Sequence, residues 1–488
     1  MVAAAGAAAG GRLLLGSRPV APTSSAVAAA ERARSRSGAV VSRDIRAAPA
    51  VLDLGGRQVS TWAYDSVGPT RPIRAAVGDE LRVRLVNALP ESTTIHWHGL
   101  ALRNDMDGVP DVTMAPVTPG SAFDYAFTLP HPGTYWFHPH VGVQLDTALH
   151  APLIIDDPGE ATNYEEEAVL VLDDWTDGWS TAPAEILAAA RRDGMGGMGD
   201  MGGMGGMDDM GSGGGVSAER PLGADTGDVR YPAHLINGRL PADPWVIRSR
   251  PGRRIRLRLI NAGSDTAYRV AVGGHRLTVT HTDGFPVEPT TVDTLVIGMG
   301  ERYDVLVTAG DGVFPVVAVP EGKDDPVAHA LLRTGGGSAP DAGVRPAELT
   351  RTMLTYGAVR ARADVRLGPV APDRTLRMTL TMADGGRRWL INDKAYADHE
   401  PLAISAGERV RLVLSNQSMM FHPMHVHGHT FALTSPAGAG PRKDTVNVLP
   451  MQDVAVDLQA NNPGQWLAHC HNAYHGELGM MTTLSYSR

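Results

Sequence analysis

The chain contains one cysteine, Cys470, so no disulfide can form within it and this residue has to be considered as a thiol. Aromatic residues account for only 5% of the sequence, and no uninterrupted apolar run approaches the roughly 18 residues of a membrane-spanning helix. Lysine and arginine (44 residues) are fewer than aspartate and glutamate (53 residues), which gives a formal charge of −9. Because contacts with phosphates require clustered basic residues, this balance argues against a nucleic-acid-binding protein.

Histidine and methionine are the residues present in unusual number, with 18 and 19 copies. The remaining composition, 43% hydrophobic and 20% charged, is that of an ordinary soluble globular protein. At roughly 150 residues per domain, the 488 residues correspond to about three domains.

The amino-terminal segment, residues 1–42, has a biased composition. Residues 2–10 are almost all Ala and Gly, Arg12 and three leucines follow, and Ala26-Val27-Ala28 matches the small residues of a signal-peptide cleavage site. The usual charged start and a twin-arginine motif are both missing. Two interpretations stay open, an incomplete or atypical secretory signal and a disordered alanine-rich tail.

Two further segments have low complexity. Twelve of the 22 residues in 194–215 are Gly, which excludes a stable helix, and methionine recurs at every third position (Met195, Met198, Met201, Met204, Met207 and Met210). The run Gly335-Gly336-Gly337-Ser338 is typical of an interdomain linker. The one convincing helix pattern covers residues 182–192, directly before the methionine-rich segment.

A ten-residue pattern occurs three times, at residues 78–87, 252–261 and 407–416. Each copy opens with Gly, alternates apolar and polar residues, and closes with Asn. This period of two predicts a half-buried strand between two turns. Since the copies start 174 and 155 residues apart, each marks one domain-sized unit. We therefore expect an all-β chain with three tandem β-sandwiches of Greek-key type.

Histidine pairs follow the closing asparagine at the same offsets in the first and third units, whereas the second unit has Val270 and Val272 there. Each of these two units carries a second pair further on. The four pairs are His96/His98 and His138/His140 in the first unit, and His425/His427 and His469/His471 in the third. Alternate residues of a strand share a face, so each pair presents two imidazoles in one direction. Four pairs in register predict a site for several transition-metal ions at the interface of the first and third units.

Cys470 lies between His469 and His471, so the same strand geometry turns its sulfur to the opposite face. His422 precedes the third-unit pair by three residues, His475 follows Cys470 by five, and Met480 follows His475 by five. Two histidines, one cysteine and a weak axial methionine form the ligand set of a blue-copper electron-transfer site. Met481 is the alternative axial candidate, and the spacing favours Met480.

Together these motifs resemble the four copper signatures of the multicopper oxidases, a family of three-domain cupredoxin proteins that includes laccases and bacterial cuprous oxidases. The motifs are His96-Trp-His-Gly99, His138-Pro-His140, His422-Pro-Met-His-Val-His427, and His469-Cys-His-Asn-Ala-Tyr-His475 with Met480. Residues 231–238 and 389–392 also look like family landmarks. The resemblance covers roughly residues 45–488 and implies three cupredoxin-like domains, at 43–158, 159–338 and 339–488.

The resemblance also implies four copper ions as cofactors. Type 1 copper would be held by His422, Cys470, His475 and Met480, and type 2 copper by His96 and His425. One type 3 copper would be held by His98, His138 and His471, and the other by His140, His427 and His469. The internal repeat exchanges these last two sets, as a symmetric binuclear pair requires.

The implied reaction takes electrons one at a time from a reducing substrate and delivers four of them to O2, releasing water. His469, Cys470 and His471 would give the electrons a short bonded route between the copper sites. Asp107, in Asp107-Gly-Val-Pro110, matches an acid that the family places near the cluster as a proton donor. An ordinary turn aspartate before Gly is the alternative for Asp107. Glu477, close to His475, is expected to be a solvated surface acid, with proton relay or cation steering as its alternative.

The electron donor is expected to be Cu(I), a phenolic compound, or both. Thioethers are soft ligands that select Cu(I), so segment 194–215 is interpreted as copper-handling, with a plain linker as the alternative. Met419, Met420 and Met424 flank His422 and either continue that path or belong to the core.

Two other functions stay open on the sequence: a laccase with phenolic donors only, and a non-catalytic copper-binding or buffering protein. A monomer suffices because one chain contains all three units. We expect an exported protein, in the cell envelope or outside the cell, with a role in copper tolerance.

Overall fold

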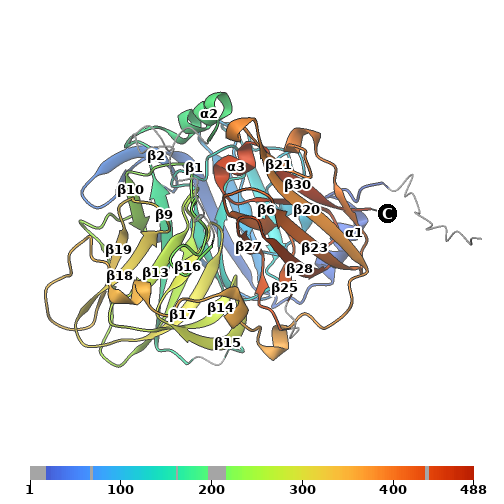
Figure 1. Ribbon diagram of the computed structural model, residues 1–488. Helices are drawn as coiled ribbons and strands as arrows, with labels where there is room; N and C mark the ends of the chain where they lie inside the picture. Colours follow the sequence, from blue (N-terminus) through green and yellow to red (C-terminus); the bar gives the residue numbers. More distant parts are fainter. Residues whose placement is uncertain (1–17, 66–69, 161–162, 196–215, 435–438, 488) are drawn as a thin grey trace, which may run out of the picture.

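The computed structural model describes residues 18–65, 70–160, 163–195, 216–434 and 439–487. In this part of the chain, six β-sheets form three pairs in sequence order, and only short helices accompany them (Figure 1). The expected fold class, all-β with three tandem cupredoxin-like sandwiches, is confirmed. One large cluster of buried apolar residues runs through the first and third units, and the main core of the second unit is separate. The first and third units are therefore joined by a common core.

The first unit has two four-stranded sheets, ordered β2-β1-β4-β6 and β3-β8-β7-β5. Its strands are β1 (Val40–Asp53), β2 (Gln58–Tyr64), β3 (Ile73–Ala76), β4 (Glu80–Asn87), β5 (His96–His98), β6 (Ala122–Thr128), β7 (Gly133–His138) and β8 (Ala151–Asp156).

The second unit has a six-stranded sheet, β10-β9-β12-β17-β14-β15, and a five-stranded sheet, β11-β19-β18-β13-β16. Its strands are β9 (Glu166–Trp175), β10 (Ala233–Ile236), β11 (Trp245–Arg248), β12 (Arg254–Asn261), β13 (Tyr268–Val272), β14 (Leu277–Thr282), β15 (Phe285–Val292), β16 (Leu295–Ile297), β17 (Arg302–Thr308), β18 (Val313–Pro320) and β19 (Ala328–Arg333).

The third unit repeats this arrangement, with a six-stranded sheet, β21-β20-β23-β28-β25-β26, and a five-stranded sheet, β22-β30-β29-β24-β27. Its strands are β20 (Arg374–Ala383), β21 (Arg388–Ile391), β22 (Leu402–Ile404), β23 (Arg409–Asn416), β24 (His422–Val426), β25 (Phe431–Leu433), β26 (Arg442–Lys443), β27 (Thr445–Val448), β28 (Asp453–Gln459), β29 (Gln465–Cys470) and β30 (Met481–Tyr486).

The threefold sequence pattern forms the equivalent strands β4, β12 and β23, and the asparagines that close them make the same contacts. The side-chain amides of Asn87, Asn261 and Asn416 each donate to main-chain carbonyls on two separate segments. Each side-chain oxygen accepts from the N–H two residues further on. This Asx turn fixes the loop that leads into the next strand, which carries the histidine pair in the first and third units.

The predicted helix is α2 (Pro183–Asp193), one residue later than expected. Proline at its first position needs no N–H partner, and Ile186, Leu187 and Ala190 are buried. Gly194 ends the helix with a φ of 87°, a conformation that favours glycine. The other two α-helices are α1 (Ser25–Arg32) and α3 (Ala473–Glu477).

Residues 18–42 of the amino-terminal segment are ordered, so they differ from a disordered alanine-rich tail, one of the two interpretations of the sequence. Here the chain forms α1 and contacts two units: Val20 N–H donates to the carbonyl of Tyr486, and Glu31 Oε1 accepts from both N–H and Oγ1 of Thr128. Val27, in the middle of the cleavage-like tripeptide, is 2% exposed. Short-range composition did not reveal these long-range contacts. Residues 1–17 lie outside the described part.

Glu31 is expected to anchor this segment. Glu31→Ala removes a buried acceptor from two donors of Thr128, so we expect the local free energy of unfolding to fall by about 1–3 kcal/mol. Native-state hydrogen exchange of the α1 amides measures this change. Asp124→Ala, which removes an exposed partner of Arg84, serves as the control with an expected change below about 0.5 kcal/mol. Unchanged exchange in α1 would show that Glu31 is not the anchor.

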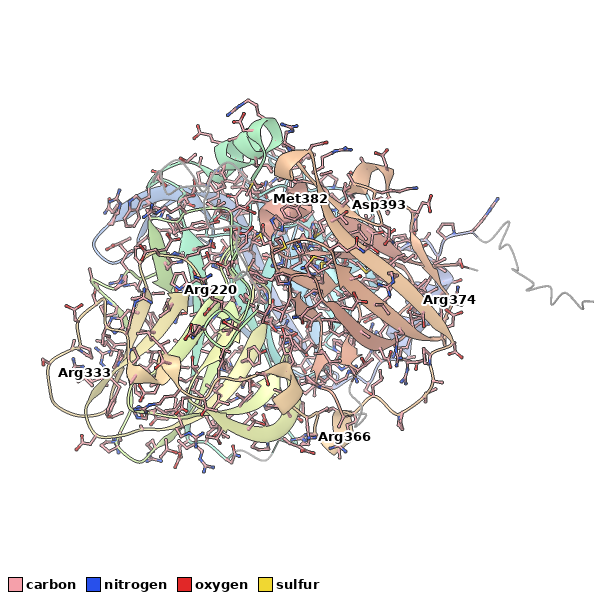
Figure 2. The ribbon with its side chains drawn as sticks, in the orientation of Figure 1. Arg220, Arg333, Arg366, Arg374, Met382 and Asp393 are labelled. Carbon is pink, nitrogen blue, oxygen red and sulfur yellow. The ribbon has the colours of Figure 1, made fainter. Side chains whose placement is uncertain are left out.

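The arginines of the outer surface take part in separate local contacts. Figure 2 shows Arg333, Arg366 and Arg374 at different places on the outside of the molecule. Arg366 pairs with Glu288 and Arg374 with Glu408.

None of the helices in the described ranges is long and apolar enough to span a bilayer.

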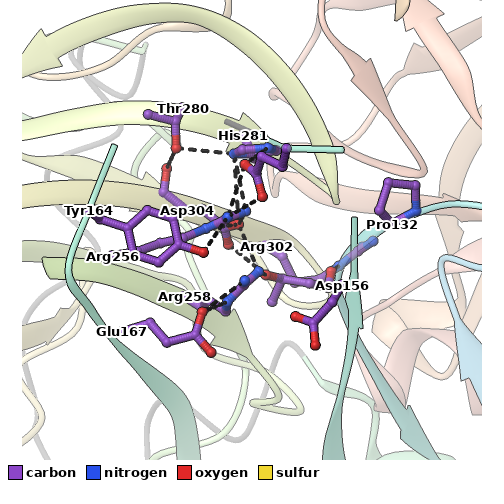
Figure 3. A network of polar contacts seen from close by, with 12 residues as sticks. Pro132, Asp156, Tyr164, Glu167, Arg256, Arg258, Thr280, His281, Arg302 and Asp304 are labelled. Carbon is purple, nitrogen blue, oxygen red and sulfur yellow. Dashed lines mark hydrogen bonds and ion pairs between the residues drawn. The ribbon is translucent and has the colours of Figure 1, made fainter. Parts of the chain in front are cut away.

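Strand β12 departs from the predicted half-buried pattern, because Arg256 and Arg258, on its polar face, are also buried. Both guanidinium groups contact the carboxylate of Asp304, which also accepts from Thr134 Oγ1 of the first unit (Figure 3). The arginines therefore lie between the first and second units, and Asp304, Glu160 and Glu167 together compensate their charge. The alternation of apolar and polar residues along one strand cannot predict such a contact between units.

Candidate metal centres

The four histidine pairs lie on, or end within two residues after, two equivalent pairs of antiparallel strands. In the first unit β5 pairs with β7, which places His96 opposite His138. In the third unit β24 pairs with β29, which places His425 opposite His469. The two strand pairs meet at the interface of the first and third units.

The eight imidazoles of these pairs converge on one region. Among the described residues, potential metal-ligating side chains with ligand atoms within 4.8 Å of one another form five groups, and all five lie in or beside this region. Three consist of histidines alone: His98, His138 and His471; His140, His427 and His469; and His96, His98 and His425. Each of the three combines residues of the first and third units.

Two stacked ring pairs join the units across the interface. His96 stacks on His427 with ring centroids 3.8 Å apart, and His98 stacks on His425 at 3.9 Å. The internal repeat exchanges one stack with the other. The site therefore has the approximate twofold arrangement that the repeat predicts.

The nitrogens that face the centre of this cluster fit metal ions. Several buried nitrogens have no hydrogen-bond partner: Nε2 of His96, His138 and His425, Nδ1 of His98, and both ring nitrogens of His471. Nε2 of His469 lies only 3.0 Å from Nε2 of His427 and 3.5 Å from Nε2 of His140. Buried polar atoms without partners are costly, and imidazole nitrogens suit copper. The donor set therefore fits a cluster of copper ions.

Main-chain carbonyls hold the opposite ring nitrogens of two of these histidines. Nδ1 of His96 lies 2.9 Å from the carbonyl oxygen of Asp107, and Nδ1 of His425 lies 2.9 Å from that of Asp444. In each case Nδ1–H donates and Nε2 is left to face the cluster. Such contacts set the orientation of a metal-binding imidazole.

The carboxylates of the same two aspartates each reach a histidine of the other unit. Oδ2 of Asp107 lies 2.9 Å from Nδ1 of His427, and Oδ1 of Asp444 lies 3.2 Å from Nε2 of His98. Asp107 lies in a recognisable sequence motif, whereas Asp444 carries no local sequence signal. The structure makes them counterparts under the internal repeat.

The environment of the cluster favours neutral imidazoles. Burial lowers the pKa of each of the following histidines below its ordinary value, and repulsion between neighbouring imidazoles adds to the effect: His98, His138, His140, His425, His427, His469 and His471. A neutral imidazole has a free lone pair, which is the form that binds a metal.

The second candidate centre is formed by His422, Cys470 and His475, which are all fully buried. Cys470 Sγ lies 3.7 Å from Nδ1 of His422 and 3.8 Å from Nδ1 of His475, and these two nitrogens are 3.3 Å apart. Tetrahedral ligands on a metal with bonds of about 2.0 Å to nitrogen and about 2.3 Å to sulfur would be about 3.3–3.5 Å apart. Met480 is fully buried, and its main chain bonds to both Cys470 and His475. This donor set fits a blue-copper site.

Residues of other segments surround His475. Its Nε2 lies 2.8 Å from Oδ2 of Asp228, and the ring of Trp389 stacks on it with centroids 3.9 Å apart. Burial alone would lower the pKa of His475, but hydrogen bonds with Asp228 and Cys470 raise it to about 10. Asp228 comes from the second unit, so all three units contribute to the surroundings of the two candidate centres.

The structure separates the methionines near these centres. Met481 is half-buried and begins β30, while Met420 and Met424 are 2% and 1% exposed and belong to the core. Met419 is 60% exposed. Of these neighbours of His422, Met419 alone is on the surface.

Glu477 is less exposed than the sequence analysis expects. It is half-buried, its carboxylate lies 3.5 Å from Arg191 of α2, and burial raises its pKa. Sequence reasoning also missed Asp228 and Asp444, because single acids in loops and short strands carry no local signal. Trp389 lies in a motif that the sequence analysis noted without assigning it a role.

Comparisons with known proteins agree with this architecture. Three multicopper oxidase sequence profiles match the chain, at residues 48–160, 166–337 and 369–488. The multicopper oxidase MmcO of Mycobacterium tuberculosis is 47% identical over 464 residues, which cover 94% of this chain and 90% of that protein.

Two further comparisons are more distant. A copper resistance protein A homolog of Pseudomonas syringae pv. tomato is 28% identical, covering 88% of this chain and 89% of its own. The crystal structure of a multi-copper oxidase from Pseudomonas thermotolerans has a TM-score of 0.68 and 28% identity, covering 92% of this chain and all of that one. This chain belongs to the multicopper oxidases. It is therefore a copper-dependent oxidase enzyme.

Proposed function

We propose that this chain couples the one-electron oxidation of Cu(I), and of phenolic donors, to the four-electron reduction of O2 to water. The balanced reaction for the metal donor is 4 Cu(I) + O2 + 4 H⁺ → 4 Cu(II) + 2 H2O. His422, Cys470, His475 and Met480 would hold type 1 copper, and His96 and His425 type 2 copper. The two type 3 ions would be held by His98, His138 and His471, and by His140, His427 and His469. Four resident copper ions would accept electrons singly and deliver them to O2.

The observation that carries this proposal is the bonded link between the two candidate centres. Cys470 belongs to one donor set, and its chain neighbours His469 and His471 belong to the other. His469 and Cys470 end β29, where alternate side chains point to opposite faces, and His471 follows the strand directly. A single peptide bond on each side of Cys470 would therefore connect the type 1 copper, where a donor is oxidised, with the histidine cluster, where O2 is reduced.

Asp107 is proposed as the residue that supplies protons. It is fully buried, its Oδ2 contacts Nδ1 of His427, and its Oδ1 lies 3.3 Å from Nδ1 of His96. An acid in contact with the cluster histidines can donate a proton where O2 is reduced, as general acid catalysis requires. A surface turn aspartate would not be enclosed in this way.

The flanks of the methionine-rich segment support Cu(I) as a donor. Residues 196–215 lie outside the described part, and Met195, just before them, is 1% exposed. On the amino-terminal side, Arg191 pairs with Glu477, two residues after His475. On the carboxyl-terminal side, Asp228 contacts His475 itself. Both flanks therefore contact the segment that contains a proposed type 1 ligand.

A variant of this segment tests the donor. Replacing Met198, Met201, Met204, Met207 and Met210 by serine keeps a Gly-rich segment of the same length but removes the soft thioether ligands. We expect kcat/KM for Cu(I) to fall about tenfold, equivalent to about 1.4 kcal/mol, with the rate for a simple phenol unchanged. Oxygen uptake by copper-loaded protein measures both rates.

The control replaces Gly197, Gly203, Gly206, Gly213 and Gly214 by serine and keeps every methionine. Equal rates in all three proteins would contradict a copper-handling role and would make the segment a plain linker. Oxygen uptake with the phenol but not with Cu(I) would favour a laccase with phenolic donors only. Absence of oxygen uptake with either donor would favour the copper-buffering alternative.

We further propose that the protein acts as a monomer and is exported to the cell envelope or exterior, where it contributes to copper tolerance. All residues of both candidate centres lie in one chain, which supports the monomer. Export is supported by the Ala- and Leu-rich composition of the first residues. Cleavage within residues 26–28 is not part of this proposal, because it would cut α1.

A further inference from the structure

The second unit supplies none of the cluster histidines, yet one of its arginines lies where all three units meet. Arg302, at the start of β17, is fully buried. Its Nη1 and Nη2 donate to the two carboxylate oxygens of Asp444 in the third unit, at 2.7 and 2.6 Å. Its Nε donates to the main-chain carbonyl of Thr134 in the first unit, at 3.1 Å. Such a bidentate contact fixes the plane of the carboxylate.

Asp444 contacts two cluster histidines, His98 through its carboxylate and His425 through its carbonyl oxygen, with Oδ1 a further 3.5 Å contact of His425 Nδ1. Its Oδ1 lies 3.2 Å from Nε2 of His98, and its carbonyl oxygen lies 2.9 Å from Nδ1 of His425. With these nitrogens engaged, Nδ1 of His98 and Nε2 of His425 are the unpartnered atoms that face the cluster.

Asp107, the counterpart of Asp444, has no bidentate contact with an arginine among the described residues. Asp107 makes the equivalent contacts with His96 and His427, but among the described residues no Lys or Arg is paired with it. The approximate twofold symmetry of the cluster is therefore broken by the second unit, which engages one aspartate and leaves the other without a cation.

Close packing around Arg302 leaves no room for a different arrangement. Gly99 follows His98, and a Cβ there would collide with Nη2 of Arg302 and Oδ2 of Asp444. Gly300 precedes Arg302 by two residues and has a φ of 82°. A Cβ on it would lie 2.9 Å from the ring of His471 and 3.0 Å from that of His98. The turn before β17 therefore forms a wall of the histidine cluster.

The rest of the strand is held in place by the buried network of Figure 3. Asp304, two residues after Arg302 and on the same face, accepts from Thr134 Oγ1 and from Arg256. Thr134 thus contacts both residues of β17, through its side chain and its carbonyl. Arg256 belongs to this network without reaching Asp444, because its contacts are with Asp304 and Glu160.

We propose that Arg302 is a positioning residue for the trinuclear copper centre: through Asp444 it fixes which nitrogens of His98 and His425 face the metal. This inference rests on the proposed function, which assigns those two histidines to type 3 and type 2 copper. The second unit, which has Val270 and Val272 where the other units have a histidine pair, has a role at the cluster through this arginine.

The test uses the full-length copper-loaded protein and the variant Arg302→Met. Loss of an outer contact of this kind weakens metal binding by about 10- to 100-fold, so we expect type 2 copper to be lost to a chelator such as EDTA at correspondingly lower concentration. The readouts are copper per chain, the type 2 signal in electron paramagnetic resonance, and the blue type 1 absorption. Since Arg302 makes no contact with His422, Cys470 or His475, the blue absorption should persist.

Two further variants separate positioning from charge and from general stability. Arg302→Lys keeps the positive charge but not the planar fork, so we expect near-normal thermal stability with weakened type 2 copper. Arg256→Met removes an equally buried arginine of the same network, and we expect lower thermal stability with normal type 2 copper. If Arg302→Met fails to fold, Arg302→Lys alone decides the question.

Normal type 2 copper in Arg302→Lys would overturn the inference, since charge would then suffice. Equal loss in Arg256→Met and Arg302→Met would overturn it as well, because the effect would be one of general stability. A wild-type protein that binds copper but gives no type 2 signal would overturn the proposed trinuclear centre together with the inference.

Discussion

Replacing Cys470 by serine is expected to abolish the blue absorption and to reduce oxygen uptake to that of metal-depleted protein. Serine lacks the thiolate that gives a blue-copper site its ligand set, and it removes the sulfur between the two candidate centres. Because Cys470 is fully buried and similar in size to serine, we expect the fold to persist. Absorption, oxygen uptake and copper content measure the result, and one copper ion per chain should be lost.

Met481→Leu is a suitable control, since Met481 neighbours the proposed axial ligand Met480 but begins β30 and is half-buried. It should leave colour and rate unchanged. A Cys470→Ser protein that still turned over at the full rate would show that electrons reach the cluster by another route, and the assignment of type 1 copper would be wrong.

Asp107→Asn is expected to slow the reduction of O2 by about 10²- to 10⁴-fold, the range typical of a lost general acid. The amide still accepts a hydrogen bond from Nδ1 of His427, so the histidine should stay in place while the donated proton is missing. Stopped-flow measurement separates two steps: reduction of the blue absorption by the donor should keep its wild-type rate, and reoxidation by O2 should slow.

Asp105→Asn is the matched control, because Asp105 lies two residues away in the same segment and pairs with Arg103 near the surface. It should leave both rates unchanged. If Asp107→Asn reoxidised at the wild-type rate, Asp107 would only hold His427, and the protons would reach the cluster elsewhere.

The sequence predicts the fold and the histidine cluster well because both depend on periodic patterns. Alternation over eight residues is enough to define β4, β12 and β23, and a spacing of two residues puts each pair of histidines on one face. The repeat then relates the first unit to the third, which predicts their meeting at one interface. The structure brings the predicted groups together, while the copper assignments stay a prediction.

The features that the sequence could not predict are contacts between residues far apart in the chain. Arg302 and Asp444 are 142 residues apart, and Asp228 and His475 are 247 residues apart. Each belongs to a different unit from its partner, and no local spacing connects them. Similarly, Arg256 and Arg258 alternate like solvent-facing residues, and contacts with Asp304 of β17 explain their burial.

Residues 18–42 differ from a disordered tail for a related reason. An alanine-rich segment has little propensity to form a core of its own, and composition alone favours a leader or a tail. The segment is ordered through partners in other units, among them Thr128, Tyr486 and Asn462, which contacts Arg34.

Because Cys470 is the single thiol of the chain and is buried, its reaction with a thiol reagent reports how often the structure around it opens. A cysteine-specific reagent can modify only one position, and that position is 0% exposed, so modification requires the surroundings of β29 to open. The labelling rate thus gives the frequency of that opening without any engineered probe. The ratio of the labelling rates before and after copper loading would give the protection that metal binding provides at this site. Complete labelling in denaturant would give the total concentration of protein chains.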